Sequence, residues 1–384
     1  MGLRCAIVPP TPVPYREPLF RALSERPDLD ICVIYQSAGQ PSWDVPAEWF
    51  PSEHPYPATH LSSWQRRRAG RTPMLWPRGI ERALSGAHPD CVVVWEYGAA
   101  SLRALAWCRR HRRAYVIFTE CTPAIDSMLP GWQLALHRRL ARHADAMIVA
   151  SSAAQQRLLS FGVPDERITV ALQAADLDAF RAAVPARTEA GPLRVISVGR
   201  LVPDKNFGTL IRATPANAEI EIVGTGFLED ELKRLAARRG VPVHLRGHVP
   251  PSQMPGLYGA ADVYALISTY EPFGVAVREA AAAGLPIVCS RTAGAAGDVA
   301  IEGRNALLVD PRDVDAVADA LTRLANDPEL RARMGEESRA IDRETDGVEV
   351  DAFAEAVAAA GRRYAPSSAG NTSARSRATE ASGR

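Results

Sequence analysis

The stretch that decides the fold is Ser268-Thr-Tyr-Glu271-Pro-Phe-Gly274-Val-Ala-Val-Arg-Glu279-Ala-Ala-Ala-Ala-Gly284-Leu-Pro286-Ile-Val. The apolar run before it predicts a buried strand over Val263–Ile267. The Ala-rich segment then predicts a helix that begins near Gly274 and stops at Gly284, because glycine commonly ends helices. An apolar run from Pro286 predicts the next strand. A strand, a helix and a second strand in this order form a βαβ unit, which is typical of a parallel sheet.

The same alternation of short apolar runs and helix-length amphipathic segments extends along the 384 residues. It is interrupted near Phe180–Gly191, where Ala, Pro, Thr and Gly gather, and then starts again. At about 100–200 residues per domain, the length also favours two domains. We therefore predict an α/β fold of two doubly wound, Rossmann-like domains that face each other across a cleft. The predicted strands are Leu3–Val8, Ile31–Tyr35, Cys91–Trp95, Tyr115–Phe118 and Ala146–Val149, then Leu193–Val198, Ile220–Val223, Val243–Leu245, Val263–Ile267, Pro286–Cys289 and Leu307–Val309.

The opening stretch places two carboxylates beside a helix N-terminus. The N–H groups of Phe273, Gly274 and Val275, with the helix dipole behind them, favour a bound phosphate. Glu271 in the loop and Glu279 inside the helix can accept hydrogen bonds from the vicinal hydroxyls of a sugar and a ribose. These residues therefore indicate a sugar, a phosphate and a ribose bound together. The alternative is that Glu271 caps the helix and Glu279 is a solvated surface charge.

The stretch also resembles the donor motif of the retaining family 4 glycosyltransferases, written E-x-F-G-x-x-x-x-E-A-x-A-x-G-x-P. The resemblance implies the GT-B architecture, contact of Glu271 with the donor sugar and contact of Glu279 with the nucleotide ribose. The matching residues are Glu271, Phe273, Gly274, Glu279, Ala280, Ala282, Gly284 and Pro286.

The resemblance covers most of residues 193–310. Gly199-Arg200-Leu-Val-Pro-Asp-Lys205-Asn206 is similar to the family loop in which an Arg and a Lys bind the donor diphosphate. Two cationic side chains in a loop after a strand suit that role, although such residues alone are more often surface charges.

Three further segments are similar to family segments. In Ile222-Val-Gly224-Thr-Gly226 the resemblance implies that Gly224 leaves room near the nucleotide, whereas the alternative is a tight turn. Gly247-His248-Val249 resembles a loop that borders the nucleobase through its backbone, and His248 is more readily a bystander than a catalyst. Gly294-Ala-Ala-Gly-Asp298 matches a downstream segment in which Asp298 replaces the usual Glu.

The first half departs from the family in its loops. The family often has a Gly-rich loop after the first strand, but this chain has Pro9-Pro-Thr-Pro-Val-Pro-Tyr15-Arg16. Tyr15 and Arg16 are candidates for the acceptor side, and Arg16 either contacts a phosphate or an acceptor carboxylate or is a helix-surface charge. Glu120 stands roughly where many members place a His, and we expect it to bind a substrate hydroxyl or to act as a base. Glu96, after Cys91–Trp95, is a further candidate; the alternative for both glutamates is a turn carboxylate.

All seven tryptophans lie between Trp43 and Trp132, several of them in the Pro-, Trp- and Arg-rich stretch 40–78. Tryptophan rings stack well on sugars, but a small local core under a long loop is the commoner arrangement. The basic cluster of Arg66, Arg67, Arg68 and Arg71 is most simply a solvated face.

We expect residues 1–187 to bind the acceptor and residues 188–346 to bind the nucleotide sugar. A helix over about 347–364 is expected to pack back on the first domain, and the tail 366–384 to be disordered. The net charge of +1 provides no field for nucleic acid, so no nucleic-acid partner is expected. The six cysteines form no C-x-x-C pair, and no apolar run approaches about 18 residues. We therefore predict a cytoplasmic protein with at most peripheral membrane contact.

Together these features predict a glycosyltransferase that moves a sugar from a nucleoside-diphosphate sugar to a hydroxyl of a small-molecule, lipid-linked or glycan acceptor, with retained anomeric configuration. The predicted catalytic residues are Arg200, Lys205, Glu271 and Glu120. No metal or cofactor is expected, because cationic side chains and backbone donors can stabilise the leaving diphosphate. Two alternatives remain, a nucleotide-sugar epimerase of the same architecture and a catalytically silent nucleotide-sugar-binding homologue.

Overall fold

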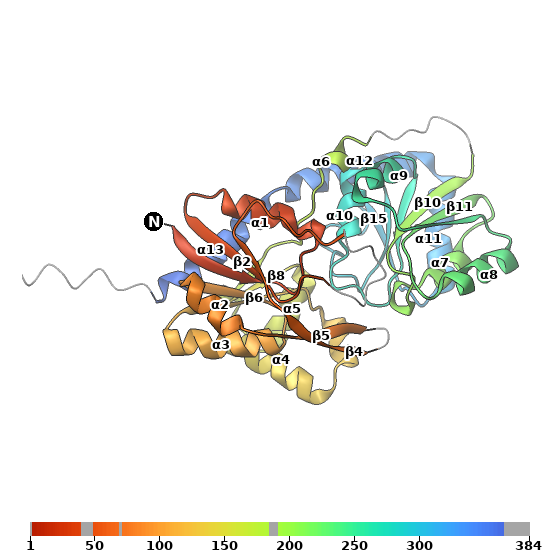
Figure 1. Cartoon of the computed structure of the whole chain (residues 1–384). Coiled ribbons are helices and arrows are strands. Elements are labelled where there is room, and N and C mark those ends of the chain that lie inside the picture. The colour runs from red at the N-terminus through yellow and green to blue at the C-terminus, as the bar shows by residue number, and fades with distance from the viewer. Residues whose placement is uncertain (1, 40–48, 69–70, 184–190, 365–384) are drawn as a thin grey trace, which may run out of the picture.

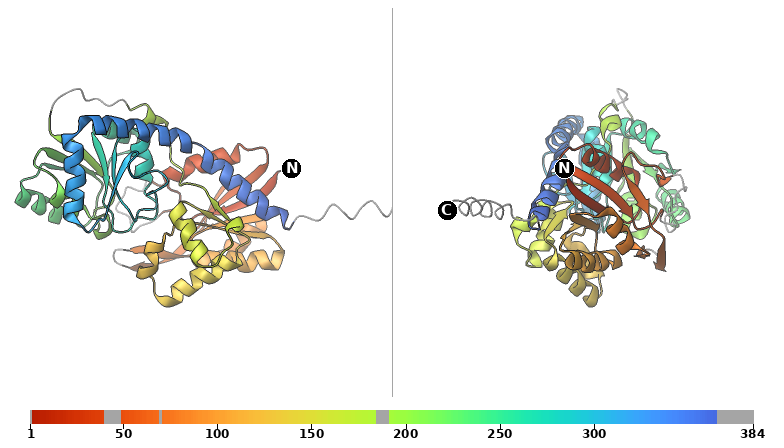
Figure 2. Two further views of the ribbon diagram at one scale, coloured as in Figure 1. Left: turned by 180° about the vertical axis from the view of Figure 1, so that it is seen from behind. Right: turned by 60° about the vertical axis from the view of Figure 1, so that its left-hand side comes forward.

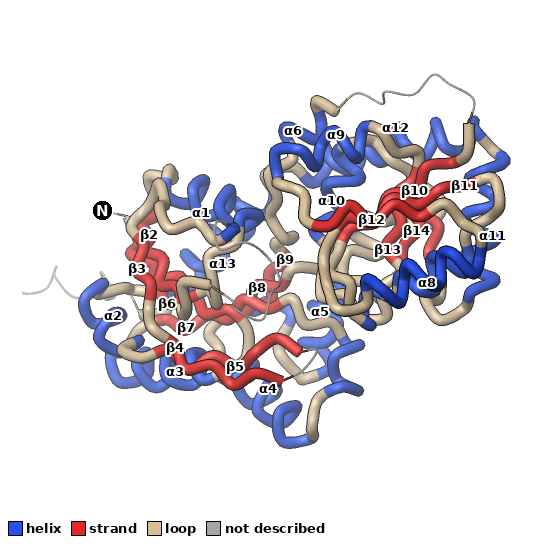
Figure 3. The backbone as a smooth tube through the Cα atoms, turned by 45° about the vertical axis from the view of Figure 1, so that its right-hand side comes forward, coloured by secondary structure: helices blue, strands red, loops and turns tan. Residues whose placement is uncertain are grey.

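The computed structural model describes residues 2–39, 49–68, 71–183 and 191–364, and these residues form two α/β units (Figure 1). Each unit is built on one sheet (Figure 3). Within each of these sheets neighbouring strands pair in parallel. The strand orders are β3-β2-β1-β6-β7-β8-β9 and β12-β11-β10-β13-β14-β15. The predicted pair of doubly wound domains is confirmed.

The first sheet contains every strand predicted for the first half. Its strands are β1 (Leu3–Val8), β2 (Leu29–Tyr35), β3 (Ala58–His60), β6 (Cys91–Trp95), β7 (Ala114–Thr119), β8 (Ala146–Val149) and β9 (Ile168–Val170). All residues of β6 and β7 are buried, as their continuous apolar character requires in a sheet covered on both faces. The helices of this unit are α1 (Glu17–Ser24), α2 (Ile80–Ala87), α3 (Ala99–His111), α4 (Gly131–His143) and α5 (Ser152–Ser160).

The second sheet likewise follows the predicted runs. Its strands are β10 (Leu193–Val198), β11 (Ala218–Val223), β12 (Val243–Gly247), β13 (Val263–Leu266), β14 (Ile287–Ser290) and β15 (Ala306–Val309). Its helices are α7 (Phe207–Ala213), α8 (Glu229–Arg239), α9 (Met254–Gly259), α10 (Val275–Ala282), α11 (Val314–Asn326) and α12 (Pro328–Thr345).

The stretch expected to be irregular contains regular structure that the sequence pattern did not indicate. An antiparallel hairpin is formed by β4 (Ser63–Arg68) and β5 (Arg71–Pro77), in which Trp64 lies opposite Trp76 with ring centroids 5.0 Å apart. The strands β3 and β9 were also missed, because three residues are too short to show a period. Trp43 and the side chains of Arg66–Arg68 and Arg71 lie outside what the structure describes.

The chain crosses between the two units twice. The first crossing follows β9 and leads to α6 (Asp178–Arg181), which already packs against α9 and α10 of the second unit. The second joins α12 to α13 (Val348–Arg362), and α13 packs on the strands of the first unit, as the view from behind shows (Figure 2). There Phe353 lies near the stacked rings of Trp95 and Phe118, whose centroids are 3.9 Å apart.

A direct contact also joins the units away from the crossings. The Asp298 carboxylate of the second unit accepts hydrogen bonds from the backbone N–H of Ser152 (2.8 Å) and from its Oγ (2.6 Å) at the start of α5. In the described part of the chain, no helix has the length and apolar character needed to cross a membrane.

Candidate active site in the cleft

The strand orders of the two sheets indicate where a ligand would bind in each unit. In each sheet the sequential order of the strands changes direction at one point. This switch point lies between β1 and β6 in the first sheet and between β10 and β13 in the second. Ligands of doubly wound sheets bind beyond the carboxyl ends of strands at such switch points. The loops after these four strands line one cavity of about 790 Å³ between the two units.

The donor-side wall is centred on an ion pair between Lys205 and Glu271. The Lys205 Nζ contacts Glu271 Oε2, and Ser268 Oγ donates a hydrogen bond to the same oxygen at 3.1 Å. Gly199 leaves space for the lysine stem, because a Cβ there would lie 3.2 Å from Lys205 Cδ. Arg200 lines the same cavity. The structure therefore brings together all three residues predicted for the donor phosphates and sugar.

The N-terminus of α10 opens on the same cavity. Gly274 precedes the helix with a φ of +99°, which a residue with a side chain rarely adopts. A Cβ there would also lie 3.3 Å from Glu271 Cγ, which is a tight contact. Gly274, Val275 and Ala276 line the cavity. The first N–H groups of an α-helix have no hydrogen-bond acceptor within the helix. With the helix dipole, these donors form a site suited to a phosphate.

Phe273 contributes to this wall through packing and backbone contacts. Its side chain is buried in the core, while its carbonyl accepts a hydrogen bond from the Ala295 N–H at 2.9 Å. Gly294 donates its N–H to the Glu271 carbonyl at 3.1 Å, and a Cβ on Gly294 would lie 2.0 Å from the Pro272 carbonyl oxygen. Gly294 therefore holds the Glu271 loop in place. The family resemblance had covered Gly294 but assigned it no role.

Five predicted donor residues lie outside the residues that line this cavity: Gly199, described above, and Gly224, His248, Val249 and Glu279. A Cβ on Gly224 would lie 2.0 Å from the Gly199 carbonyl oxygen, so this glycine allows two loops to pack against each other. His248 is exposed and Val249 is half-buried at the end of β12. Glu279 accepts a hydrogen bond from the Tyr258 hydroxyl at 2.6 Å, and burial raises the pKa of its carboxyl while this bond opposes the rise. Their contacts with the nucleotide stay predictions.

The acceptor-side wall has an ion pair of its own, between Arg16 and Glu120. The Arg16 Nη2 lies 3.0 Å from Glu120 Oε1, which also accepts a hydrogen bond from the Trp95 indole at 3.4 Å. The guanidinium lies over the Trp95 ring at 5.2 Å and over the Tyr15 ring at 5.3 Å. Burial opposes the charge of Arg16, but Tyr15 and Glu120 outweigh it and raise its pKa. Arg16 is thus a buried residue of the cavity and not a helix-surface charge.

Glu96 lines the same cavity beside Glu120. It adopts a left-handed φ of +60°, and its carboxylate accepts hydrogen bonds from the Glu120 N–H (2.6 Å) and Thr119 Oγ1 (2.8 Å). Burial, and then the nearby charge of Glu120, raise its pKa. Glu96 therefore has the contacts of a turn carboxylate and holds the loop that carries Glu120. Because it also lines the cavity, its contact with an acceptor stays a prediction.

Among the residues of this wall that the sequence did not indicate is a histidine, His137. Its ring stacks on Tyr97 with centroids 4.2 Å apart, and its Nδ1 lies 3.1 Å from Arg157 Nη2. Arginine can only donate, so Nδ1 is the acceptor and the proton of the neutral ring is on Nε2. Burial, and then the Arg157 charge, lower the pKa of His137 to about 4. Arg157 is fully buried and is held by Asp126 at 2.8 Å.

The sequence pattern that could have indicated His137 is its spacing of four residues from Gln133. Residues four apart on a helix share a face, and Gln133 and His137 of α4 both line the cavity. Around them the wall is apolar or aromatic, with Trp76, Ile125, Met128, Leu129 and Trp132.

Comparison with known proteins agrees with this geometry. The family described as glycosyl transferases group 1 matches residues 182–341, and the family described as Glycosyltransferase Family 4 matches residues 19–179. The GDP-mannose-dependent alpha-(1-6)-phosphatidylinositol monomannoside mannosyltransferase of Mycolicibacterium smegmatis is 32% identical over 279 residues, which are 66% of this chain and 72% of the relative. The chain belongs to the family 4 (group 1) glycosyltransferases.

Other relatives of this glycosyltransferase share less of their length. The D-inositol 3-phosphate glycosyltransferase of Corynebacterium glutamicum is 34% identical over 225 residues, which are 52% of this chain and 54% of the relative. Among solved structures, Anabaena HepE in complex with UDP has a TM-score of 0.75 at 20% identity, covering 93% of this chain and 98% of that one. Sucrose-phosphate synthase from Thermosynechococcus elongatus has a TM-score of 0.72 at 18% identity, covering 94% and 98%. The predicted GT-B fold and the predicted glycosyltransferase family are confirmed.

Proposed function

We propose that this glycosyltransferase transfers a sugar from a nucleoside-diphosphate sugar, bound against the second unit, to a hydroxyl held by the first unit, with retention at the anomeric carbon. The observation that carries the proposal is one cavity that combines the Lys205–Glu271 ion pair with the N-terminus of α10. Relatives support the donor class, because one is named for its dependence on GDP-mannose and HepE is described in complex with UDP-glucose.

The ion pair suggests how the donor binds. A diphosphate entering beside Gly274 would compete with Glu271 for the Lys205 ammonium, and Arg200 on the same wall would add a second cation. Glu271, released from lysine, could then accept hydrogen bonds from the donor sugar. The bond between the anomeric carbon and the phosphate oxygen breaks with its electron pair going to the diphosphate, where these groups stabilise the charge.

The transfer step needs no separate base. The acceptor oxygen forms the new bond on the face from which the diphosphate leaves, and its proton passes to the leaving phosphate oxygen. Cationic side chains and backbone N–H groups perform the charge stabilisation that a metal provides in other enzymes, so we propose a metal-independent reaction without a cofactor.

The acceptor is proposed to lie on the wall formed by Gln133, His137 and the surrounding apolar side chains. The Nε2–H of a neutral His137 donates a hydrogen bond to an acceptor oxygen, and Glu120 accepts one from the reacting hydroxyl. Aromatic rings beside hydrogen-bonding groups suit a polyhydroxylated ring with an apolar face. We propose a small-molecule, lipid-linked or glycan acceptor, no nucleic-acid partner, and action in the cytoplasm with at most peripheral membrane contact.

A donor panel tests this function. The protein would be incubated with UDP-, GDP- and ADP-sugars, with and without methyl glycosides, myo-inositol and lipid extract, while release of the nucleoside diphosphate is measured in the presence of EDTA. Acceptor-dependent release and a product with the donor's anomeric configuration by NMR are expected. Conversion of the donor to an epimer without acceptor would instead support the epimerase. Nucleotide binding without turnover would support a silent homologue.

A further inference from the structure

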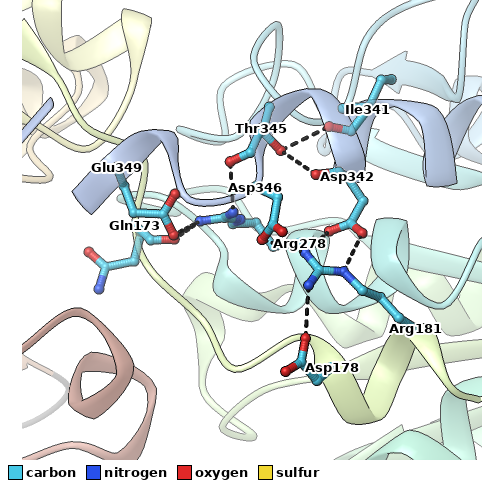
Figure 4. A network of polar contacts seen from close by, with 9 residues as sticks. All are labelled: Gln173, Asp178, Arg181, Arg278, Ile341, Asp342, Thr345, Asp346 and Glu349. Carbon is cyan, nitrogen blue, oxygen red and sulfur yellow. Dashed lines mark hydrogen bonds and ion pairs between the residues drawn. The ribbon is translucent and has the colours of Figure 1, made fainter. Parts of the chain in front are cut away.

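The donor helix α10 carries a buried arginine that the proposed chemistry does not use. Arg278 lies directly before Glu279, and its side chain is 2% exposed. Successive residues of a helix point about 100° apart, so Arg278 and Glu279 face different surroundings. Glu279 meets Tyr258 of α9, whereas Arg278 points to the two crossings between the units (Figure 4).

One guanidinium contacts both crossings. The Arg278 Nη1 donates to the Gln173 carbonyl of the first crossing at 2.8 Å and to Glu349 Oε1 of α13 at 3.0 Å. Its Nη2 donates to the Thr345 carbonyl at the end of α12, at 3.3 Å. Any rotation of one unit against the other must change the backbone conformation of these two connecting segments. The helix that carries the donor site is therefore tied to the segments about which the cleft would change its shape.

The contact between Arg278 and Glu349 is a buried ion pair. Glu349 is 8% exposed in its side chain, so both members of the ion pair are withdrawn from water. Removing one member of such a pair leaves the other charge buried without compensation, whereas replacing both by apolar residues often restores folding. The planar, forked guanidinium can reach three acceptors at once, which a lysine cannot do in the same geometry.

We propose that Arg278 is a positioning residue, which fixes α10, and with it Glu271 and the phosphate-binding N-terminus, relative to the acceptor-side wall through both crossings. The proposal rests on the proposed function for its effect on turnover, and its effect on the arrangement of the two units is independent of it.

A neighbouring arginine provides a matched control. Arg181 of α6 pairs with Asp342 of α12 at 2.7 Å and with Asp346 at 2.6 Å, and the Asp342 side chain is 4% exposed (Figure 4). Arg181→Met therefore also strands a buried charge at the crossings, but none of these contacts reaches α10.

The test compares Arg278→Met, Arg181→Met and the double variant Arg278→Met/Glu349→Leu with the wild type. For Arg278→Met we expect kcat/KM for the donor to fall at least tenfold, with Arg181→Met within about threefold of wild type. We expect the double variant to regain the wild-type unfolding midpoint but not the turnover. If the double variant regains turnover as well, or if Arg181→Met loses as much activity as Arg278→Met, Arg278 serves stability alone and the proposal is overturned.

A second measurement separates this proposal from the proposed function. Spin labels placed at Arg110 of α3 and Arg238 of α8 by non-canonical amino acids report the distance between the units without any ligand. We expect Arg278→Met and the double variant to broaden this distance distribution, and Arg181→Met to leave it unchanged. An unchanged distribution in Arg278→Met overturns the proposal even if the wild type turns over no nucleotide sugar.

Discussion

The two walls of the cleft each contain an ion pair. The cation is the more exposed member of one pair, and the carboxylate is the more exposed member of the other. On the donor side the cation is the more accessible member, with side-chain exposures of 19% for Lys205 and 9% for Glu271. On the acceptor side the carboxylate is the more accessible one, with 9% for Arg16 and 19% for Glu120. One wall thus presents positive charge, as a diphosphate requires, and the other presents a hydrogen-bond acceptor, as a hydroxyl requires.

The walls also differ in what surrounds each pair. Lys205 and Glu271 lie beside a helix N-terminus, so the lysine can exchange its carboxylate for a phosphate. The Arg16 guanidinium lies over the rings of Tyr15 and Trp95, which help to hold it beside Glu120. On the donor wall the lysine can change its anionic partner, whereas on the acceptor wall the arginine keeps one position.

The largest effect is expected on the donor wall. Lys205→Ala removes a charge that stabilises the leaving diphosphate, and the loss of one such contact typically lowers kcat by about 10²–10³. Steady-state release of nucleoside diphosphate measures it. Lys205→Arg keeps the charge and should retain more activity, and turnover of Lys205→Ala near the wild-type value would contradict the role of the pair.

On the acceptor wall, Glu120→Gln should lower kcat by about 10–10², because a hydrogen bond to a charged group contributes about 1.5–3 kcal/mol. The affinity for the nucleoside diphosphate, measured by calorimetry, should not change, since Glu120 lies on the opposite wall. The control is Glu166→Gln, at an exposed position outside the cavity, which should leave kcat unchanged. If Glu120→Gln weakens nucleotide binding as much as Lys205→Ala does, the division between the walls is wrong.

The buried, neutral His137 makes the acceptor wall sensitive to acid. Its pKa in the folded chain, about 4, lies below the ordinary value of 6.5, so the unfolded chain binds more protons between these values. The free energy of unfolding should therefore fall as the pH is lowered from about 6.5 to 4, by about 2.5 kcal/mol from this group. Urea titrations at pH 7 and 4.5 would show a smaller fall in His137→Phe than in the wild type.

The same substitution should weaken acceptor binding at neutral pH. His137→Phe keeps the stack on Tyr97 but removes the Nε2–H donor, and one neutral hydrogen bond contributes about 0.5–1.5 kcal/mol. The KM for the acceptor should rise about 3–10-fold, with the KM for the donor unchanged. His143→Phe, at the exposed end of the same helix, is the matched control, and an equal change in both variants would argue against the proposed contact.

The smallest effect is expected at the direct contact between the two units, away from the cavity. Asp298→Asn weakens the contact with the N-terminus of α5, which contributes about 0.3–1 kcal/mol at an exposed site. The kcat/KM should change by less than about threefold, and the exposed Asp319→Asn should have no effect. A loss as large as that of Lys205→Ala would show that this contact, and not the donor wall, limits the reaction.

The sequence could predict the donor wall because its groups are local or are ordered by strands. Glu271, Gly274 and the helix start lie within a few residues, and apolar runs predicted the strands that bring Arg200 and Lys205 beside them. Gly294 and Tyr258 were not assigned roles, since their contacts with Glu271 and Glu279 depend on packing between separate segments. The acceptor wall was harder, because its residues follow predicted strands but pair with residues of separate loops and of α4, so their contacts depend on packing.

By itself, the sequence determined the two parallel sheets, their division and the βαβ unit with two glutamates and a helix N-terminus, because hydrophobic periodicity and local turn chemistry act over a few residues. Only the tertiary structure decided that Arg16 pairs with Glu120, that Glu96 supports their loop and that Arg157 fixes the proton of His137. It also decided that Arg278 joins the donor helix to both crossings. Those contacts bring together residues from distant parts of the chain, and their strength depends on burial, which exists only once the chain is folded.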